Sequence, residues 1–154
     1  MRFLAIVLLA IGIAFSAQEK ETRNVHWVSY NDALKKAKES NRLIFVSLYA
    51  DWCIPCRVME ANVFTDPDVA TLLNTRFIPV HLNAESKDTI TCDGKVKTVE
   101  RCYFDVWNLS AVPSFVLIAP KGLSILTLTD SMSAEDLRFM LIDFLRKEKE
   151  WIAQ

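Results

Sequence analysis

The feature that most constrains this chain is a pair of cysteines, Cys53 and Cys56, set between a strand-like run and a helical pattern. Residues 43–48 are almost continuously apolar, as expected of a strand that is covered on both faces. A helix should begin at or just after Cys53, where unpaired N–H groups and partial positive charge stabilise a thiolate. Because the thiolate is the nucleophile in disulfide exchange, this arrangement predicts a thiol–disulfide oxidoreductase.

Helical and strand patterns alternate along the rest of the chain. Capping residues and apolar spacing predict helices at residues 30–40, 67–75 and 133–145. Apolar runs predict further strands at residues 77–82, 115–119 and 125–128. The short link between the last two strands predicts an antiparallel hairpin, whereas the polar residues 84–110 are expected to be irregular apart from a turn at Asp93 and Gly94. This order predicts a three-layer α/β domain around a mixed sheet.

The first residues have the pattern of an export signal. Arg2 precedes an apolar run at residues 3–15, and the small residues before the end of the run predict cleavage after Ser16. We therefore expect a signal peptide at residues 1–16 and one domain at residues 17–154, in a periplasmic or secreted protein. The run is shorter than the ~20 residues of a membrane span, although an uncleaved anchor is the alternative. The net charge of −1 argues against nucleic acid or an anionic membrane as the partner, and we expect a monomer.

The cysteine pair alone is compatible with three kinds of site. Redox chemistry is one, half of a zinc site completed by Cys92 and Cys102 is another, and an inert structural disulfide is the third. Cys92 and Cys102 are ten residues apart and do not form a tight knuckle, while the first pair lies at a strand–helix junction. An exported protein also meets oxidising conditions, so redox chemistry is favoured and no metal is expected.

The roles within the pair follow from helix geometry. Cys53 should be the more exposed cysteine and the attacking thiolate, and Cys56, one turn inside the helix, should resolve the mixed disulfide. Pro55 suits the first helical turn, where a missing N–H costs nothing. Trp52 would shield the site and offer a flat face to a substrate chain, unless it packs into the core instead.

Several motifs together resemble the thioredoxin superfamily, in particular the C-terminal periplasmic domain of DsbD and related single-domain thioredoxin-like proteins. They are Trp27, residues 48–56, Met59 with Glu60, and residues 63–69. The resemblance extends over residues 27–145 and is weakest at residues 84–110. It implies a thioredoxin fold with helices on both sides of a central mixed sheet, protein disulfides or thiols as substrates, and a redox-active disulfide in place of a cofactor. It also implies a membrane electron donor of the DsbD type.

The resemblance implies further site residues. Val112 and Pro113 fall where the family has a cis-proline loop beside the cysteine pair, although Pro113 could be an ordinary proline at the entry to a strand. Glu60 falls where DsbD-like domains have a glutamate near their cysteines, although it could be a solvated charge. Ser47 replaces the aspartate usual at its position and cannot act as a base at neutral pH. His81 stands where thioredoxins have a lysine, and proton transfer for the resolving cysteine would use Glu60, His81 or water; a surface or sheet role for His81 is the alternative.

Cys92 and Cys102 have no counterpart in these motifs. A second disulfide that staples an inserted loop is the favoured interpretation, and a second redox pair that exchanges with the first is the alternative. Four cysteines allow three pairings, among which the sequence does not choose. The dipeptide between Cys53 and Cys56 lacks a histidine that would stabilise a thiolate, so reduction of other proteins is favoured over an oxidase or isomerase activity. A non-catalytic binding or chaperone-like module is the remaining alternative.

Overall fold

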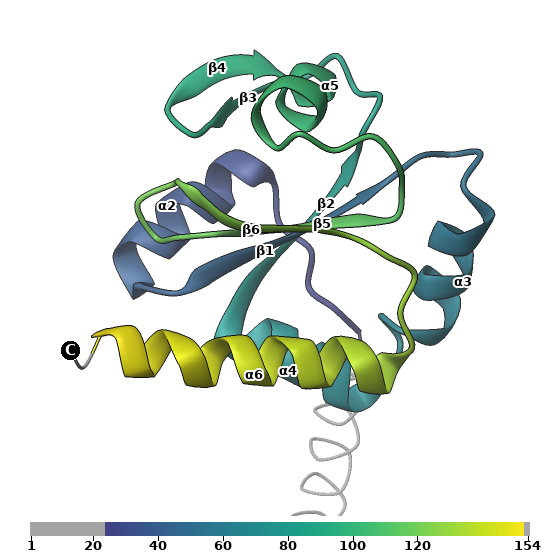
Figure 1. Cartoon of the computed structure of the whole chain (residues 1–154), viewed down its shortest axis with the longest axis vertical. Helices are drawn as coiled ribbons and strands as arrows, with labels where there is room; N and C mark the ends of the chain where they lie inside the picture. The colour runs from purple at the N-terminus through teal and green to yellow at the C-terminus, as the bar shows by residue number, and fades with distance from the viewer. Residues whose placement is uncertain (1–23, 153–154) are drawn as a thin grey trace, which may run out of the picture.

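Four strands form the sheet at the centre of the molecule, in the order β2–β1–β5–β6 (Figure 1). The computed structural model describes residues 24–152, so the expected signal peptide lies outside the described residues. Strand β1 (Leu43–Tyr49) runs parallel to β2 (Phe77–Asn83) and antiparallel to β5 (Ser114–Ile118). Strand β6 (Ser124–Thr129) pairs antiparallel with β5, which confirms the predicted hairpin and the mixed sheet. No helix in this described part of the chain is long and apolar enough to cross a membrane.

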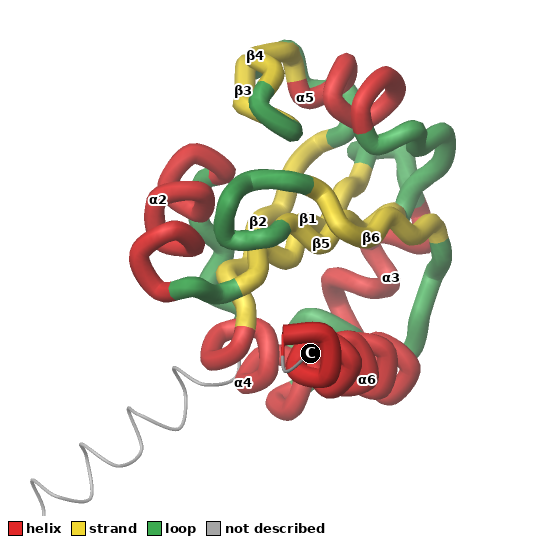
Figure 2. Tube along the Cα trace, turned by 60° about the vertical axis from the view of Figure 1, so that its left-hand side comes forward, coloured by secondary structure: helices red, strands yellow, loops and turns green. Residues whose placement is uncertain are grey.

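Helices cover both faces of this sheet, as Figures 1 and 2 show. Helix α2 (Tyr30–Ser40) packs on one face, and α3, α4 and α6 pack on the other. The bounds of these three helices are Ile54–Asn62, Pro67–Arg76 and Ala134–Ile152. Alternate residues of β1 serve the two cores: Val46 lies in the α2 core and Phe45 in the opposite one. Burial on both faces therefore explains why β1 is a continuous apolar run.

The starts of the helices follow the capping residues that the sequence indicates. The Ser29 and Ser133 hydroxyls accept backbone N–H bonds from Asp32 and Asp136, at 3.2 and 3.1 Å. Asp66 accepts two backbone N–H bonds at 3.0 Å at the start of α4. Each of these bonds satisfies a helix donor that would otherwise lack a partner, which confirms the predicted helix starts.

Residues 84–110 are not irregular, and this prediction was wrong. They contain a second sheet of two strands followed by two short helical segments, which together we call the insert (residues 89–106). Its elements are β3 (Thr89–Cys92), β4 (Lys95–Thr98), α5 (Val99–Arg101) and the π-helix η1 (Cys102–Val106). Asp93 and Gly94 both have positive φ, 47° and 75°, and make the predicted turn between the strands. The strands escaped prediction because each has four residues and only Ile90 and Cys92 of β3 are buried.

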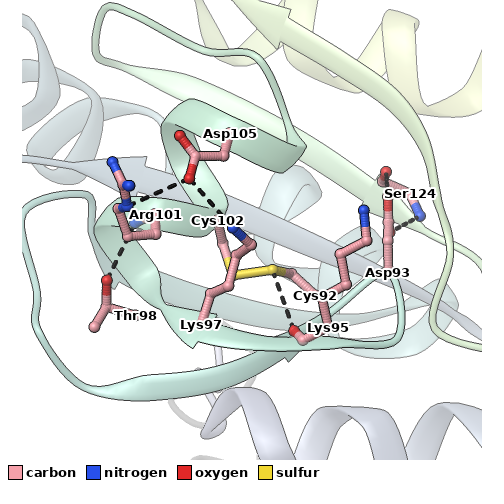
Figure 3. Close-up of a disulfide and its surroundings, with 9 residues drawn as sticks. All are labelled: Cys92, Asp93, Lys95, Lys97, Thr98, Arg101, Cys102, Asp105 and Ser124. Atoms are coloured by element: carbon pink, nitrogen blue, oxygen red, sulfur yellow. Dashed lines mark hydrogen bonds and ion pairs between the residues drawn. A yellow bond between two sulfur atoms is a disulfide. The ribbon is translucent and has the colours of Figure 1, made fainter.

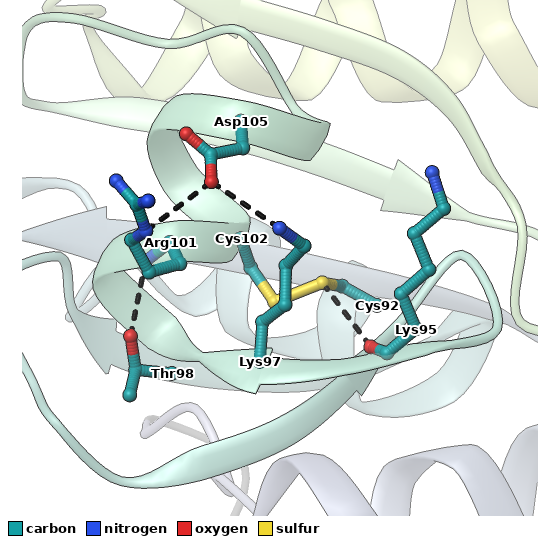
Figure 4. Close-up of polar contacts among 7 residues, drawn as sticks. All are labelled: Cys92, Lys95, Lys97, Thr98, Arg101, Cys102 and Asp105. Atoms are coloured by element: carbon teal, nitrogen blue, oxygen red, sulfur yellow. Dashed lines mark hydrogen bonds and ion pairs between the residues drawn. A yellow bond between two sulfur atoms is a disulfide. The ribbon is translucent and has the colours of Figure 1, made fainter.

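The insert is closed by an internal disulfide and attached to the main domain by buried and polar contacts (Figure 3). A disulfide joins Cys92 and Cys102, and both residues are fully buried in the α2 core. The Asp93 carboxylate accepts the N–H and the hydroxyl of Ser124, at 2.7 and 2.6 Å, and so ties the turn to the start of β6. Within the insert, Asp105 lies 3.2 Å from a lysine of β4 and 3.3 Å from an arginine of α5 (Figure 4). The insert is thus a folded unit on the α2 side of the sheet.

Candidate active site

A disulfide joins Cys53 and Cys56 at the point where β1 ends and α3 begins. Cys53 is the N-cap of α3, and its sulfur accepts a hydrogen bond from the Cys56 N–H at 3.1 Å. Pro55 lies in the first turn, as predicted. The Cys53 sulfur therefore faces a first-turn N–H and the positive end of the helix, the surroundings that stabilise a thiolate.

Cys53 is not the more exposed cysteine, which corrects the prediction made from helix geometry. Its exposed fraction is 1%, against 4% for Cys56. The Cys53 N–H donates to the Ala50 carbonyl at 3.0 Å, and this turn folds the residue under the start of the helix. Ala50 forms a buried cluster with both cysteines, and Tyr49 and Val112 pack against this cluster. In the disulfide state, side chains from the end of β1, the turn after it and the cis-proline loop thus cover the cluster.

The loop before β5 supplies the other side of the site. The peptide bond between Val112 and Pro113 is cis, the geometry that the resemblance implies, and Pro113 is buried. Val112 packs against the cysteine pair. Ser114 follows and is fully buried; its hydroxyl contacts the Ala111 carbonyl and lies 2.8 Å from the Thr129 hydroxyl. These bonds fix the start of β5 and hold the loop beside the disulfide.

Trp52 projects into solvent next to the cysteines. Its exposed fraction is 65%, so the alternative of core packing is wrong. The indole N–H donates to the Glu85 carboxylate at 3.0 Å, an acceptor that no sequence pattern indicated. Ile54 is equally exposed. Large apolar side chains that remain in water beside a reactive pair are available to a docking partner.

Glu60 and His81 lie within hydrogen-bond distance of each other, next to aromatic side chains. His81 Nε2 lies 3.0 Å from Glu60 Oε1, and the imidazole stacks on the Tyr49 ring at a centroid distance of 4.2 Å. Glu60 lies four residues after Cys56 and so on the same side of α3. Ser47, opposite His81 in the sheet register, is buried. Glu60 is thus paired with His81 although its side chain is 45% exposed, and His81 is a partly buried residue of β2. The part of either residue in proton transfer stays a prediction.

The surroundings of His81 favour its neutral form. Burial lowers the pKa of His81 below its ordinary value of 6.5, and the hydrogen bond and charge of Glu60 offset only part of this effect. The Nδ1 atom is buried and has no hydrogen-bond partner. A second proton on Nδ1 would therefore have no acceptor, whereas one on Nε2 is donated to Glu60.

The free energy of unfolding should consequently fall as the pH is lowered from about 7.5 to about 5.5. The unfolded chain takes up a proton on His81 near pH 6.5, while the folded chain does so only at lower pH. Proton uptake then favours the unfolded state, so this stability is present above pH 6.5 and is lost below it. Urea unfolding at several pH values measures the slope, which His81→Phe should reduce and the control His26→Gln should retain. An unchanged slope in His81→Phe would contradict this account.

The fold and the site together define the class of protein. A mixed four-stranded sheet, a Cys-x-x-Cys disulfide at the start of the helix after β1 and a cis-proline before β5 are the arrangement of thioredoxins. A family model described as thioredoxin-like matches residues 26–120. The chain belongs to this thioredoxin-like family.

Known proteins that resemble the chain agree with this assignment. The chain is 30% identical over 90 residues to the thiol:disulfide interchange protein DsbD 2 of Pseudomonas aeruginosa, a match that covers 58% of this chain and 14% of that protein. A thioredoxin from Thermus thermophilus has a TM-score of 0.62 at 22% identity, over 79% of this chain and 88% of that one. The reduced C-terminal domain of Neisseria meningitidis DsbD has a TM-score of 0.55 at 20% identity, over 73% of this chain and 91% of that one. The two structures show the fold alone, and the chain spans about a seventh of the DsbD sequence that it matches.

Proposed function

We propose that this protein is an exported, monomeric reductase of disulfides in other proteins, with Cys53 as the attacking cysteine and Cys56 as the resolving one. The observation that carries the proposal is the position of the Cys53 sulfur, at a helix N-terminus and 3.1 Å from the Cys56 N–H. Export is supported by the apolar N-terminal run and by the two disulfides, which persist in oxidising compartments.

The proposed reaction is a pair of thiol–disulfide exchanges. The Cys53 thiolate attacks one sulfur of the partner's disulfide, so that a bond between Cys53 and the partner forms, the partner's own bond breaks, and the released thiolate takes a proton from water. Cys56 loses its proton to Glu60 or to water and attacks the Cys53 sulfur. The Cys53–Cys56 disulfide forms and the second partner thiol leaves. Two electrons have passed to the partner, and a dithiol donor must return two for the next cycle.

The direction of electron flow rests on how well the Cys53 thiolate is stabilised. Ile54 and Pro55 between the cysteines carry no charge, and the guanidinium of Arg57 donates to the Asp51 carbonyl at 2.7 Å. A thiolate with less stabilisation corresponds to a less oxidising disulfide, which favours reduction of partners. The similarity to DsbD supports the same direction and a membrane dithiol donor of that type.

The equilibrium reduction potential of Cys53–Cys56 tests this proposal. It should be measured against glutathione or dithiothreitol in a variant with Cys92→Ala and Cys102→Ala, so that only one pair titrates. We expect a value near that of thioredoxin, about −270 mV. A value between about −120 and −180 mV, the range of DsbA and protein disulfide isomerase, would instead indicate an oxidase or isomerase.

A further inference from the structure

The insert supplies one wall of a groove that runs beside the redox pair. We call it the partner groove. Four segments contribute its principal lining residues: the turn after β1, the turn after β2, the start of the insert's π-helix η1, and the cis-proline loop. These residues are Ala50, Trp52, Glu85, Tyr103, Phe104 and Val112. Apart from Glu85, the phenol of Tyr103 and the exposed Ser110, the side chains that line the groove are mainly apolar, so the groove suits an apolar chain segment.

The partner groove is continuous with the cysteine pair. Ala50 and Val112 line the groove and also pack against Cys53 and Cys56. A partner that presents a sulfur to Cys53 therefore brings the residues next to its own cysteine close to this groove. The occupant that this geometry implies is the stretch of polypeptide that flanks the partner's cysteine.

The Phe104 side chain is exposed to solvent, while the residues next to it in the chain are fixed by packing and by bonds. Its exposed fraction is 51%, whereas Tyr103 beside it is buried and meets it edge to face at a centroid distance of 4.8 Å. The Tyr103 side chain interacts with Ser114 at the start of β5, and the Tyr103 carbonyl accepts the Leu109 N–H at 2.9 Å. The preceding residue, Cys102, is fixed by its disulfide. An exposed aromatic ring on a fixed base loses little conformational freedom when a partner covers it, which is typical of residues that dominate binding.

The charge in the partner groove further restricts which partner segments can bind there. Among the residues that line the partner groove, Glu85 has the only side chain that is charged at neutral pH, and its bond to Trp52 holds it at the rim. A carboxylate next to the partner's cysteine would face this carboxylate across an apolar surface. Repulsion and lost solvation would both weaken the binding of such a partner.

We propose that Phe104 and Tyr103 form a specificity site that selects partners with an apolar side chain beside the reactive cysteine and rejects those with an acidic one. This inference rests on the proposed reductase function and adds a substrate class to it. The insert, which the thioredoxin motifs do not include, thereby acquires a role in partner choice.

Two disulfide-linked homodimeric peptides test this inference. In one the cysteine is flanked on both sides by leucine, and in the other by aspartate. Full-length protein, reduced beforehand, is mixed with an excess of each peptide, and the second-order rate constant of its oxidation is measured. We expect the wild type to react with the leucine peptide at least about tenfold faster than with the aspartate peptide. Phe104→Ala should reduce this preference several-fold, and Phe104→Leu should restore most of it.

A matched control comes from the same insert. Val96 on β4 is 73% exposed and does not line the groove, so Val96→Ala should keep the wild-type preference. If Phe104→Ala keeps it as well, or if the wild type shows none, the inference is wrong while the reductase function stands. If the reduced wild type reacts with neither peptide and also fails to reduce a small aromatic disulfide, the proposed function fails and this inference fails with it.

Discussion

Replacing Cys56 by serine should lower the turnover of a protein disulfide by at least about a thousandfold and leave the partner attached to Cys53. The Cα atoms of the two cysteines are 5.3 Å apart, so the second thiol attacks as an intramolecular group. Serine removes that attack, and an external thiol at millimolar concentration is a poor substitute for a group held in place. The mixed disulfide should therefore accumulate.

Insulin reduction measures the turnover, and mass spectrometry under non-reducing conditions measures the adduct. Cys53→Ser is the matched control, because it should lose the turnover and form no adduct. The two variants differ only in which sulfur remains, so the comparison assigns the attacking and the resolving roles. A protein that merely binds its partners would show no turnover in the wild type either, and an adduct on Cys56 in place of Cys53 would reverse the assigned roles.

The helix starts could be predicted because each depends on contacts within a few residues. Ser29 and Ser133 bond to backbone groups three positions ahead, and the sequence displays both partners together. Strand β1 could be predicted for a related reason. Its burial on both faces requires an apolar residue at nearly every position, and that run is visible without knowledge of the partners.

The structure of the insert could not be predicted, because its main contacts join residues that are far apart in the chain. The Asp93 carboxylate bonds to Ser124, 31 positions away, and nothing near Asp93 in the sequence indicates that partner. The strands themselves have only four residues each, too few for the alternation of β3 to stand out, and no residue of β4 is buried. Only the Asp-Gly turn was evident, since it depends on two adjacent residues that tolerate positive φ.

The candidate site likewise has features that could be predicted from the sequence and features that could not. The redox role that we propose for Cys53 and Cys56 was predicted from their spacing at a strand–helix junction, which is a local property. The cluster that buries Cys53 also involves Val112, which approaches from a loop nearly sixty residues further along the chain. The bond between Glu60 and His81 likewise joins positions 21 apart on two different elements. Sequence reasoning could nominate both residues but could not place one against the other.

Removal of the second disulfide should lower the free energy of unfolding by about 3 kcal/mol. The bond closes a loop of about 11 residues. Without it, the unfolded chain regains the conformational entropy that closure of this loop removes, and the unfolded state becomes more favourable. Cys92→Ala with Cys102→Ala is the test variant, since both positions are fully buried and alanine adds no polar group. Urea unfolding should show the loss, and the exposed control Val96→Ala should change the stability by less than about 0.5 kcal/mol.

The same disulfide holds η1, so its loss should also reduce the preference for the leucine peptide. A variant that loses stability but keeps this preference would show that Phe104 is positioned without the disulfide. If Cys92 and Cys102 are instead a second redox pair, thiol labelling in a buffer near −270 mV should trap them as free thiols. A structural disulfide resists reduction until the potential is below about −300 mV. We therefore expect labelling at Cys53 and Cys56 alone under those conditions.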